Sequence, residues 1–241
     1  MKVQILENKT AIGEAVAALL CDAIREKPDC VLGLATGATP VPTYDALAAA
    51  YQAGKVSFRR VRSFNLDEYC DLPKTHKNSF YSFMQVQLFS RVDMDPANVG
   101  FLDGNADPAA ESARYTAAIE AAGGIDVQLL GIGRNGHIAF NEPADAFSQE
   151  SFRVALTEST IAANSCYFDD VPMPRFAITM GVGLILRAKR LILIATGESK
   201  AAAVKAMLEG PVTPQCPASA LQTHPDVLVF LDPAAASLLK Q

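Results

Sequence analysis

The sequence has little of what marks metal-binding, disulfide-rich or nucleic-acid-binding proteins. Its five cysteines stand at positions 21, 30, 70, 166 and 216, with no Cys-x-x-Cys pair and no spacing typical of zinc. This sparse, odd set favours a reducing compartment, and we expect no metal. The charge count of 21 basic and 26 acidic side chains gives −5 with the three histidines neutral. Without an extended basic face, nucleic acid is not an expected partner.

Long apolar runs and linkers are also missing. No apolar stretch reaches 18 residues without a charged side chain, so we expect no membrane partner. The first ten residues contain no apolar stretch of signal-peptide length, and we expect a cytoplasmic protein. Because no segment is rich in Pro, Gly or Ser, residues 1–241 are predicted to form a single domain.

What the chain does have is an alternation of short apolar runs with longer Ala-rich segments of helical period. The pattern predicts an α/β fold with an open, mainly parallel sheet and helices on both faces, a Rossmann-like three-layer sandwich. Thr39 is predicted to cap a helix that begins with Pro40, and Asp107 to cap a later one. Strands are predicted at 3–6 (an edge), 31–35, 61–66, 125–130, 176–180, 191–195 and 227–231, and helices at 11–25, 40–53, 78–90, 108–122, 181–188, 198–209 and 233–240.

Polar residues follow four of these strands, at 36–39, 65–69, 131–137 and 196–200. Parallel strands bring their carboxyl ends to one edge of the sheet, which is where ligands bind in such folds. The pattern apolar-Ala-Thr-Gly occurs twice, at 34–37 and 194–197. These two turns offer backbone N–H groups, hydroxyls and the ammonium of Lys200, a combination that suits a phosphate monoester. The alternative is that Thr39 and Ser199 only cap helices and Lys200 is solvated.

Two further segments contain candidate acid and base groups. Asp67 and Glu68 directly follow a predicted buried strand, and a carboxylate there can act as a general base. Asp67 could instead cap the next helix while Glu68 lies in solvent, and this segment alone leaves both readings open. His137 has Asn135 and Glu142 nearby, and a carboxylate within reach orients an imidazole and raises its pKa.

The remaining candidates are weaker. His76 and His224 lack such neighbours, so we predict surface or loop positions for them. The residues from Gly131 to Gly136 match the glycine pattern of dinucleotide-binding turns, but the sequence after them has little helical period. We therefore expect no nucleotide cofactor.

At these segments the sequence resembles the glucosamine-6-phosphate deaminase family, the aldose-ketose isomerases of amino-sugar catabolism. The resemblance spans almost the whole chain, and its Thr-Gly turn is shared with 6-phosphogluconolactonases and with sugar-phosphate-sensing domains of bacterial regulators. It rests on LGLATGATP (32–40), SFNLDEY (63–69), LGIGRNGHIAFNEP (130–143), ITMGVG (178–183) and LQTHPDV (221–227).

The resemblance implies a reaction that forms fructose 6-phosphate and ammonia from glucosamine 6-phosphate, with no metal, nucleotide or flavin. Asp67 would move a proton from C2 to C1. His137 would open the pyranose ring, and Glu142 would hold and tune His137. Asn135 stands where longer members of the family carry Asp, and it can orient His137 without sharing its charge.

For the phosphate, the resemblance implies a site made by five residues: Thr36, Gly37, Ala38, Thr39 and Lys200. Ala38 replaces a glycine common in relatives, which costs little if its φ is negative. Cys166 stands where relatives use an arginine on the phosphate. The arginines that could compensate are Arg134, Arg153 and Arg175.

Longer relatives are hexamers controlled by N-acetylglucosamine 6-phosphate. For this short form the resemblance implies the loss of that control, and a monomer or small homo-oligomer. Two other functions remain open from the sequence, a lactonase acting on 6-phosphogluconolactone and a sugar-phosphate sensor without turnover. Asp67 and the Phe-Asn-Glu-Pro segment at 140–143 argue against the lactonase, and the lack of an appended DNA-binding region argues against the sensor.

Overall fold

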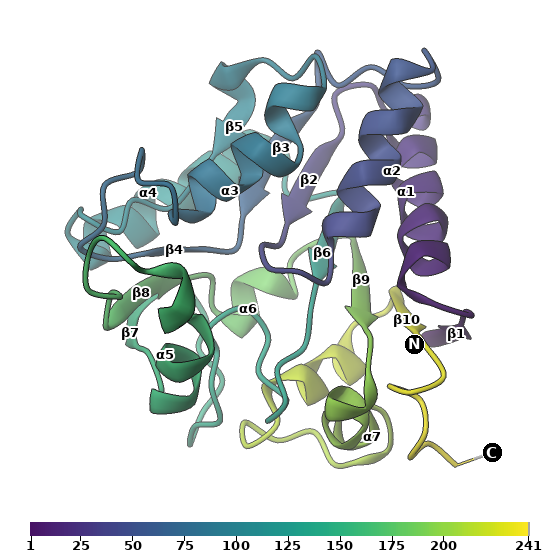
Figure 1. The fold of residues 1–241 in the computed structure, drawn as a ribbon, viewed down its shortest axis with the longest axis vertical. Coiled ribbons are helices and arrows are strands. Elements are labelled where there is room, and N and C mark those ends of the chain that lie inside the picture. The colour runs from purple at the N-terminus through teal and green to yellow at the C-terminus, as the bar shows by residue number, and fades with distance from the viewer. Residues whose placement is uncertain (241) are drawn as a thin grey trace.

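A seven-stranded sheet forms the centre of the molecule, which we describe from a computed structural model. The structure describes residues 1–240, apart from the side chains of Ser159, Ala163, Asn164 and Tyr167. All neighbouring strands run parallel, in the order β1-β10-β9-β6-β2-β3-β5, with β1 at an edge as predicted (Figure 1). The strands are β1 (Lys2–Ile5), β2 (Val31–Leu34), β3 (Arg62–Asn65), β5 (Val99–Gly100), β6 (Val127–Leu130), β9 (Arg190–Ala195) and β10 (Val227–Leu231).

Helices cover both faces of this sheet, which confirms the predicted α/β class. Residues of α1, α2 and α3 pack in one apolar cluster on one face, and residues of α4, α6 and α7 pack in another on the opposite face. Figure 1 shows α1 and α2 side by side along one flank. The helices are α1 (Lys9–Glu26), α2 (Val41–Gln52), α3 (Phe80–Gln87), α4 (Pro108–Ala121), α5 (Glu158–Asn164), α6 (Val182–Ile185) and α7 (Ala201–Glu209).

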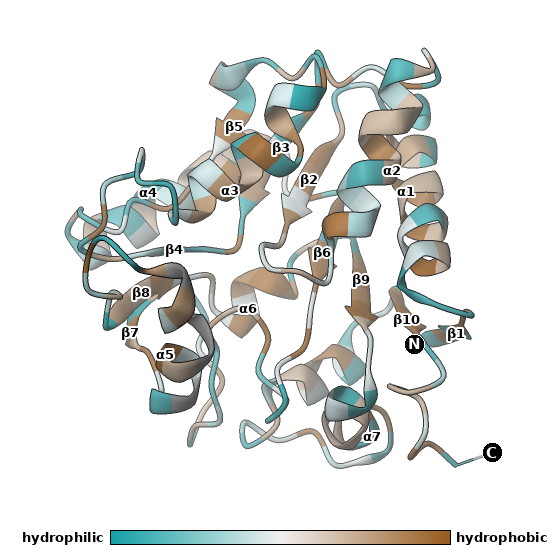
Figure 2. Cartoon of the chain, in the orientation of Figure 1, coloured by the Kyte–Doolittle hydropathy of each residue, from teal (hydrophilic) through white to brown (hydrophobic). Residues whose placement is uncertain are grey.

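The central strands are apolar throughout because both of their faces are buried. In β9, Ile192 and Ile194 face the cluster of α1 and α2, whereas Leu191 and Leu193 face that of α4, α6 and α7. All four are at most 2% exposed, and each contributes roughly 1.5–3 kcal/mol through burial. Figure 2 shows β9 and β10 as hydrophobic ribbons inside a more hydrophilic periphery.

A second, three-stranded antiparallel sheet lies beside the first, with the order β4-β8-β7. It consists of β4 (Asp67–Tyr69), β7 (Phe152–Ala155) and β8 (Phe176–Thr179). The predicted strand at 176–180 thus exists, but it does not belong to the parallel sheet. The short strands β4 and β7 were not predicted, because neither has the continuous apolar run that marks a strand buried on both faces.

A single residue links the two sheets. The Leu66 N–H donates to the Leu34 carbonyl of the parallel sheet (3.2 Å), and the Leu66 carbonyl accepts from the Met180 N–H (2.8 Å). The chain therefore leaves β3 and enters β4 with almost no loop. This crossing places Asp67 at the boundary between the two sheets.

The structure corrects several predicted helix ends. Thr39 does not cap α2; Pro40 is the cap, with no side-chain hydrogen bond, and its carbonyl accepts from Thr43 and Tyr44. Asp107 does cap α4, accepting from the Ala110 N–H at 2.9 Å. Residues 198–200 form a 3₁₀ turn, and 181–188 is helical only in α6.

Residues 233–238 form turns rather than the predicted helix. The Ala236 N–H donates to the carbonyl four residues back, but Ser237 and Leu239 donate to carbonyls three residues back, so no regular α-helical ladder forms. No helix in the part of the chain that the structure describes is both long and apolar enough to cross a membrane.

Candidate active site

The four polar segments lie together at one edge of the parallel sheet. They follow β9, β6, β2 and β3, which are four consecutive strands in the sheet order, so the predicted convergence is confirmed. The connection through α2 joins β2 to β3 on one side, and the connection through α4 returns from β5 to β6 on the other. From β2 the strands are added toward one edge of the sheet, and from β6 they are added toward the other. Ligands bind at such a switch point in the strand order, which here lies between β2 and β6.

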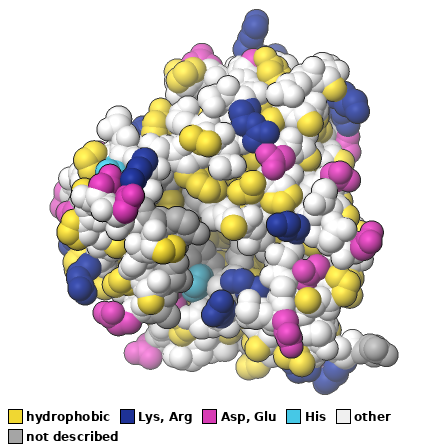
Figure 3. All heavy atoms as spheres, in the orientation of Figure 1, with side chains coloured by type: hydrophobic (Ala, Val, Ile, Leu, Met, Phe, Trp, Pro, Cys, Tyr) yellow, Lys and Arg dark blue, Asp and Glu magenta, His cyan; other side chains and the backbone are white. Residues whose placement is uncertain are grey.

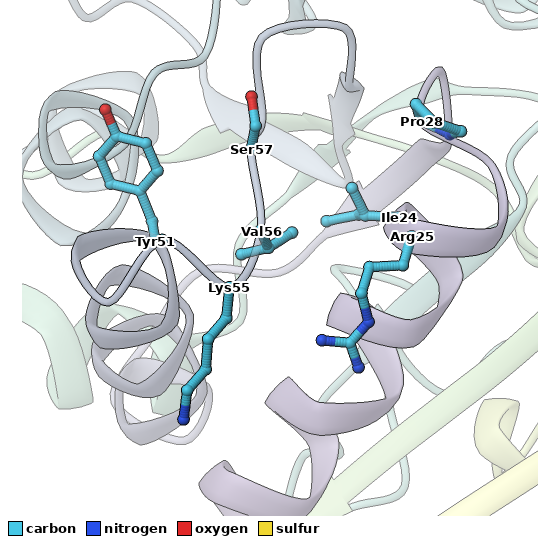
Figure 4. Close-up of a pocket in the computed structure, with 8 residues that line it drawn as sticks. Ile24, Arg25, Pro28, Tyr51, Lys55, Val56 and Ser57 are labelled. Atoms are coloured by element: carbon cyan, nitrogen blue, oxygen red, sulfur yellow. The ribbon is translucent and has the colours of Figure 1, made fainter.

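The surface is hollowed on the face seen in Figure 3, where a histidine lies close to lysine or arginine side chains at the edge of the hollow. A cavity of about 360 Å³ is lined by residues of the loop after His137 and of β7, which include Phe140, Glu142 and Phe152. A larger cavity, about 470 Å³, lies where α1 and α2 end, away from the carboxyl ends of the strands (Figure 4). Two of its polar side chains already have partners, since Arg25 pairs with Asp22 and Ser57 donates to Asp93.

The glycine-rich turn after β6 holds the His137 ring. The Gly133 N–H donates to the His137 carbonyl (2.8 Å), and the Gly136 N–H donates to the Gly133 carbonyl (3.1 Å). A Cβ on Gly133 would lie 2.2 Å from Cε1 of the His137 ring. No helix follows this turn within residues 131–151. Gly133, the central glycine of the pattern that resembles a dinucleotide-binding turn, therefore makes room for an imidazole.

His137, Glu142 and Asn135 form a connected group. Nδ1 of His137 lies 3.3 Å from Oε1 of Glu142, and the Asn135 amide donates to Oε2 of Glu142 at 2.6 Å. Burial alone would raise the pKa of Glu142, but the contacts with His137 and Asn135 outweigh it and lower that pKa. Glu142 is thus a carboxylate at neutral pH. Thr160 of α5 also reaches it, with its hydroxyl 3.5 Å from Oε1.

Two residues that the sequence analysis did not single out hold the loop between His137 and Glu142. The buried Asn141 amide donates to the carbonyls of Ile138 (3.0 Å) and Met180 (2.8 Å). The Thr179 hydroxyl of β8 accepts from the Phe140 N–H at 3.1 Å. Both residues fall in segments that carry the family resemblance, which was the available signal for them.

Asp67 is buried at the boundary between the two sheets, with 6% of its surface exposed. Among the residues that the structure describes, none donates a hydrogen bond to its carboxylate, and it does not cap a helix. Burial, with a smaller contribution from the charge of Glu68, raises the pKa of Asp67 to about 8. A buried carboxyl of this kind exchanges a proton near neutral pH, which a general base requires.

Glu68 is also buried, not solvated. Its carboxylate accepts the N–H groups of Tyr69 (2.9 Å), Phe80 (2.8 Å) and Tyr81 (2.9 Å). Two of these belong to the first turn of α3, which Ser79 caps. Glu68 therefore ties β4 to the N-terminus of α3 and holds the backbone next to Asp67.

The two Thr-Gly turns adopt similar backbones. Gly37 has φ +94° and Gly197 has φ +88°, a region that L residues seldom adopt. Ala38 is not among the residues with positive φ, so its Cβ is tolerated. Thr36 and Thr39 are half-buried, and Gly37 and Ala38 are exposed. The first turn is therefore open to a ligand.

The second turn has fewer free hydrogen-bond donors for a phosphate than predicted. The Gly197 N–H donates to both oxygens of the Asp232 carboxylate, at 3.0 and 2.9 Å, so this amide is occupied. Lys200 is half-buried beside it, and burial together with the charge of Arg134 lowers its pKa. What this turn presents to a ligand is chiefly the Lys200 side chain.

The candidate arginines differ in their surroundings. Cys166 is exposed in a 3₁₀ turn after α5. Arg153 lies 3.9 Å from the ring centroid of Phe176 and 3.5 Å from Asp71. Arg175 lies 3.9 Å from Glu158.

The other histidines lie in loops, as predicted. His76 lies 3.4 Å from Asp170, and His224 is buried, with Nε2 2.7 Å from the Ala188 carbonyl. Within the described residues, no group of three or more His, Cys, Asp or Glu side chains is arranged to hold a metal ion.

Comparison with known proteins confirms the resemblance. The family model described as glucosamine-6-phosphate isomerases/6-phosphogluconolactonase matches residues 7–230. Glucosamine-6-phosphate deaminases of Shewanella loihica and Cellvibrio japonicus are each 50% identical over 241 residues, covering 99% of this chain and 90% and 92% of theirs. A solved monomeric glucosamine-6-phosphate deaminase is 44% identical with a TM-score of 0.94, covering 99% of this chain and all of its own. A 6-phosphogluconolactonase from Thermotoga maritima shares the fold, with a TM-score of 0.76. It is 19% identical, and the match covers 96% of this chain and 98% of its own. The chain therefore belongs to the glucosamine-6-phosphate isomerase/6-phosphogluconolactonase family.

Proposed function

We propose that this chain converts glucosamine 6-phosphate to fructose 6-phosphate and ammonia, by an aldose-ketose isomerisation that leads to loss of the amine. Full-length relatives at 50% identity carry the name of this activity. The observation that carries the proposal is the pair of environments at the sheet edge. Asp67 is buried without a hydrogen-bond donor and has a raised pKa, whereas Glu142 is held ionised beside His137. Carboxyl groups with pKa values pushed apart serve different proton-transfer steps.

His137 is proposed to open the sugar ring. It would take the proton of the anomeric hydroxyl and deliver one to the ring oxygen. Glu142 faces Nδ1 of His137 and stabilises the imidazolium while the proton is held, and Asn135 orients Glu142 through its 2.6 Å hydrogen bond. Ring opening produces the free aldehyde at C1, which acidifies the hydrogen on C2.

Asp67 is proposed to move that proton. The C2 amine of the substrate is an ammonium at neutral pH, and an opposite charge nearby favours the carboxylate form of an acid. Substrate binding would thus ionise Asp67 next to the carbon it must deprotonate. Asp67 takes the C2 proton while the ammonium gives up one of its protons to O1, which forms an enolamine. Asp67 then returns its proton to C1, which leaves a hydroxyl on C1 and an iminium at C2. Water then adds at C2, and ammonia departs as the ketone forms.

The phosphate is proposed to bind at the first Thr-Gly turn and Lys200, that is, at Thr36, Gly37, Ala38, Thr39 and Lys200. The turn after β2 is exposed and offers hydroxyls and amides, and Lys200 supplies charge from two strands away. The phosphate would then lie at one end of the site, with Asp67 and His137 toward the sugar carbons.

The decisive experiment is to incubate the protein with glucosamine 6-phosphate and to measure ammonia and fructose 6-phosphate together. Both should appear in equal amounts. Asp67→Asn should abolish exchange of the C2 proton, and His137→Gln should slow mainly ring opening. Hydrolysis of 6-phosphogluconolactone in place of deamination would establish a lactonase, and binding without turnover would establish a sensor. An Asp67→Asn protein with full activity would refute the mechanism.

Three coarser expectations accompany this function. A solved relative is described as monomeric, and we expect this chain to act as a monomer or small homo-oligomer, which light scattering can measure. We also expect a single domain over residues 1–241 and a cytoplasmic location, where a phosphorylated sugar is retained.

A further inference from the structure

We propose that Arg134 is a direct ligand of the substrate's phosphate, acting with Lys200 as the second cation of that site. The proposal rests on the proposed function for the identity of the substrate, and it adds a residue that the family resemblance does not assign to phosphate binding.

The first observation is position. Arg134 lies in the turn after β6 and Lys200 in the turn after β9, and these strands are neighbours in the sheet. Residues 133–136 form a tight turn closed by the Gly136 to Gly133 hydrogen bond, with Arg134 and Asn135 at its centre. Asn135 turns its amide to Glu142, so Arg134 extends from a backbone that is already held at the active site.

The second observation is the lack of a counter-ion. Within the described residues, neither Arg134 nor Lys200 has a carboxylate within 4.0 Å, whereas Arg153 and Arg175, the other two candidates, each have an acidic neighbour. Arg134 is exposed and Lys200 half-buried, and the two are near enough for the charge of Arg134 to help lower the pKa of Lys200. Figure 3 shows cationic side chains grouped beside a histidine at the hollow.

Two neighbouring cations without a counter-ion repel each other, and this repulsion disfavours the empty site. A phosphate monoester carries close to two negative charges at neutral pH and removes the repulsion when it binds. A planar guanidinium also presents two parallel N–H donors to phosphate oxygens, which an ammonium cannot do. The two cations therefore match the charge of the ligand, and Arg134 adds directional hydrogen bonds to the point charge of Lys200.

The test compares Arg134→Met with Arg60→Met, an exposed arginine in the loop before β3, at the opposite edge of the sheet. Arg134→Met should raise the KM for glucosamine 6-phosphate and the inhibition constant of inorganic phosphate by about 10- to 100-fold, as expected for a lost charge-assisted bond. The value of kcat should change little, because the contact is made equally in the ground and transition states. Arg134→Lys should show a smaller increase, and Arg60→Met none.

Calorimetry with inorganic phosphate and with fructose 6-phosphate separates this proposal from the proposed function, because binding needs no turnover. If the wild type deaminates its substrate but Arg134→Met binds phosphate normally, the role of Arg134 is refuted and the function stands. If the wild type shows no turnover yet Arg134→Met binds phosphate more weakly, the function fails and the ligand assignment stands. A fall in kcat with unchanged phosphate binding also overturns the proposal. A thermal melt of each variant confirms that this exposed position leaves the fold intact.

Discussion

Replacing Asp67 with Asn should change the stability of the protein, relative to the wild type, more favourably the higher the pH. Burial and the charge of Glu68 raise the pKa of Asp67 to about 8, from an ordinary value of 3.8. Between these two pH values the folded protein holds a proton that the unfolded chain has lost. The contribution of Asp67 to the free energy of unfolding is therefore fully present below pH 4 and is lost as the pH rises through 8. Asn carries no such proton.

The magnitude follows from the size of this pKa shift. One bound proton changes the free energy of unfolding by about 1.4 kcal/mol per pH unit, so the full shift corresponds to at most roughly 6 kcal/mol. The Asn amide adds a constant cost of about 1–3 kcal/mol if it too lacks a partner. The diagnostic quantity is therefore the pH slope of the difference between variant and wild type, not its absolute value.

The assay is urea unfolding of both proteins at pH 5.5, 6.5, 7.5 and 8.5. Far-ultraviolet circular dichroism is the suitable signal, because the sequence contains no tryptophan. The free energy of unfolding of the variant minus that of the wild type should increase at each step up to pH 8 and stay constant above it. A difference that stays flat, or that shrinks as the pH rises, would show that Asp67 is not held protonated in the folded protein. The same variant should lack deaminase activity, so that stability and function trade off at one residue.

Two further predictions concern a glycine and a second aspartate. Gly133→Ala would place a Cβ 2.2 Å from the His137 ring, and moving the ring by about 1 Å should lower kcat on the order of 100-fold. Gly131→Ala, whose Cβ would meet no atom within 4 Å, is the matched control, and equal activities in the two variants would contradict the steric reasoning. Asp126→Asn should show the opposite pH dependence to Asp67→Asn. Burial opposes ionisation of Asp126, but hydrogen bonds from two lysines outweigh it and lower its pKa. Loss of the Asp126 carboxylate should lower the free energy of unfolding at pH 7. This difference from the wild type should disappear as the pH falls through the lowered pKa. A loss of stability that persists at acid pH would mean that packing, not charge, is responsible.

Sequence pattern was most informative where burial is local and periodic. All seven predicted strands exist, because a run such as 191–195 must be apolar when both faces of a strand are covered. The repeated Thr-Gly pattern also predicted two similar turns at one edge, and Gly37 and Gly197 have nearly the same φ. The pattern gave wrong predictions at segment ends, since Thr39 does not cap α2 and residues 233–238 form turns. It also could not assign a buried strand to its sheet, because that depends on distant partners, and β8 pairs with β4 and β7 in a separate sheet.

The sequence by itself determined the parallel α/β architecture and which segments meet at the carboxyl edge of the sheet. These follow from hydrophobic period and from the geometry of parallel strands. Only the tertiary structure decided what each polar group does there. Asp67 is buried because Leu66 joins two sheets, the Gly197 amide is occupied because Asp232 follows a neighbouring strand, and Arg134 lies near Lys200 because β6 pairs with β9. The partners in these contacts are as many as 114 residues apart in the chain, so no local pattern encodes them, and packing alone sets their charge and accessibility.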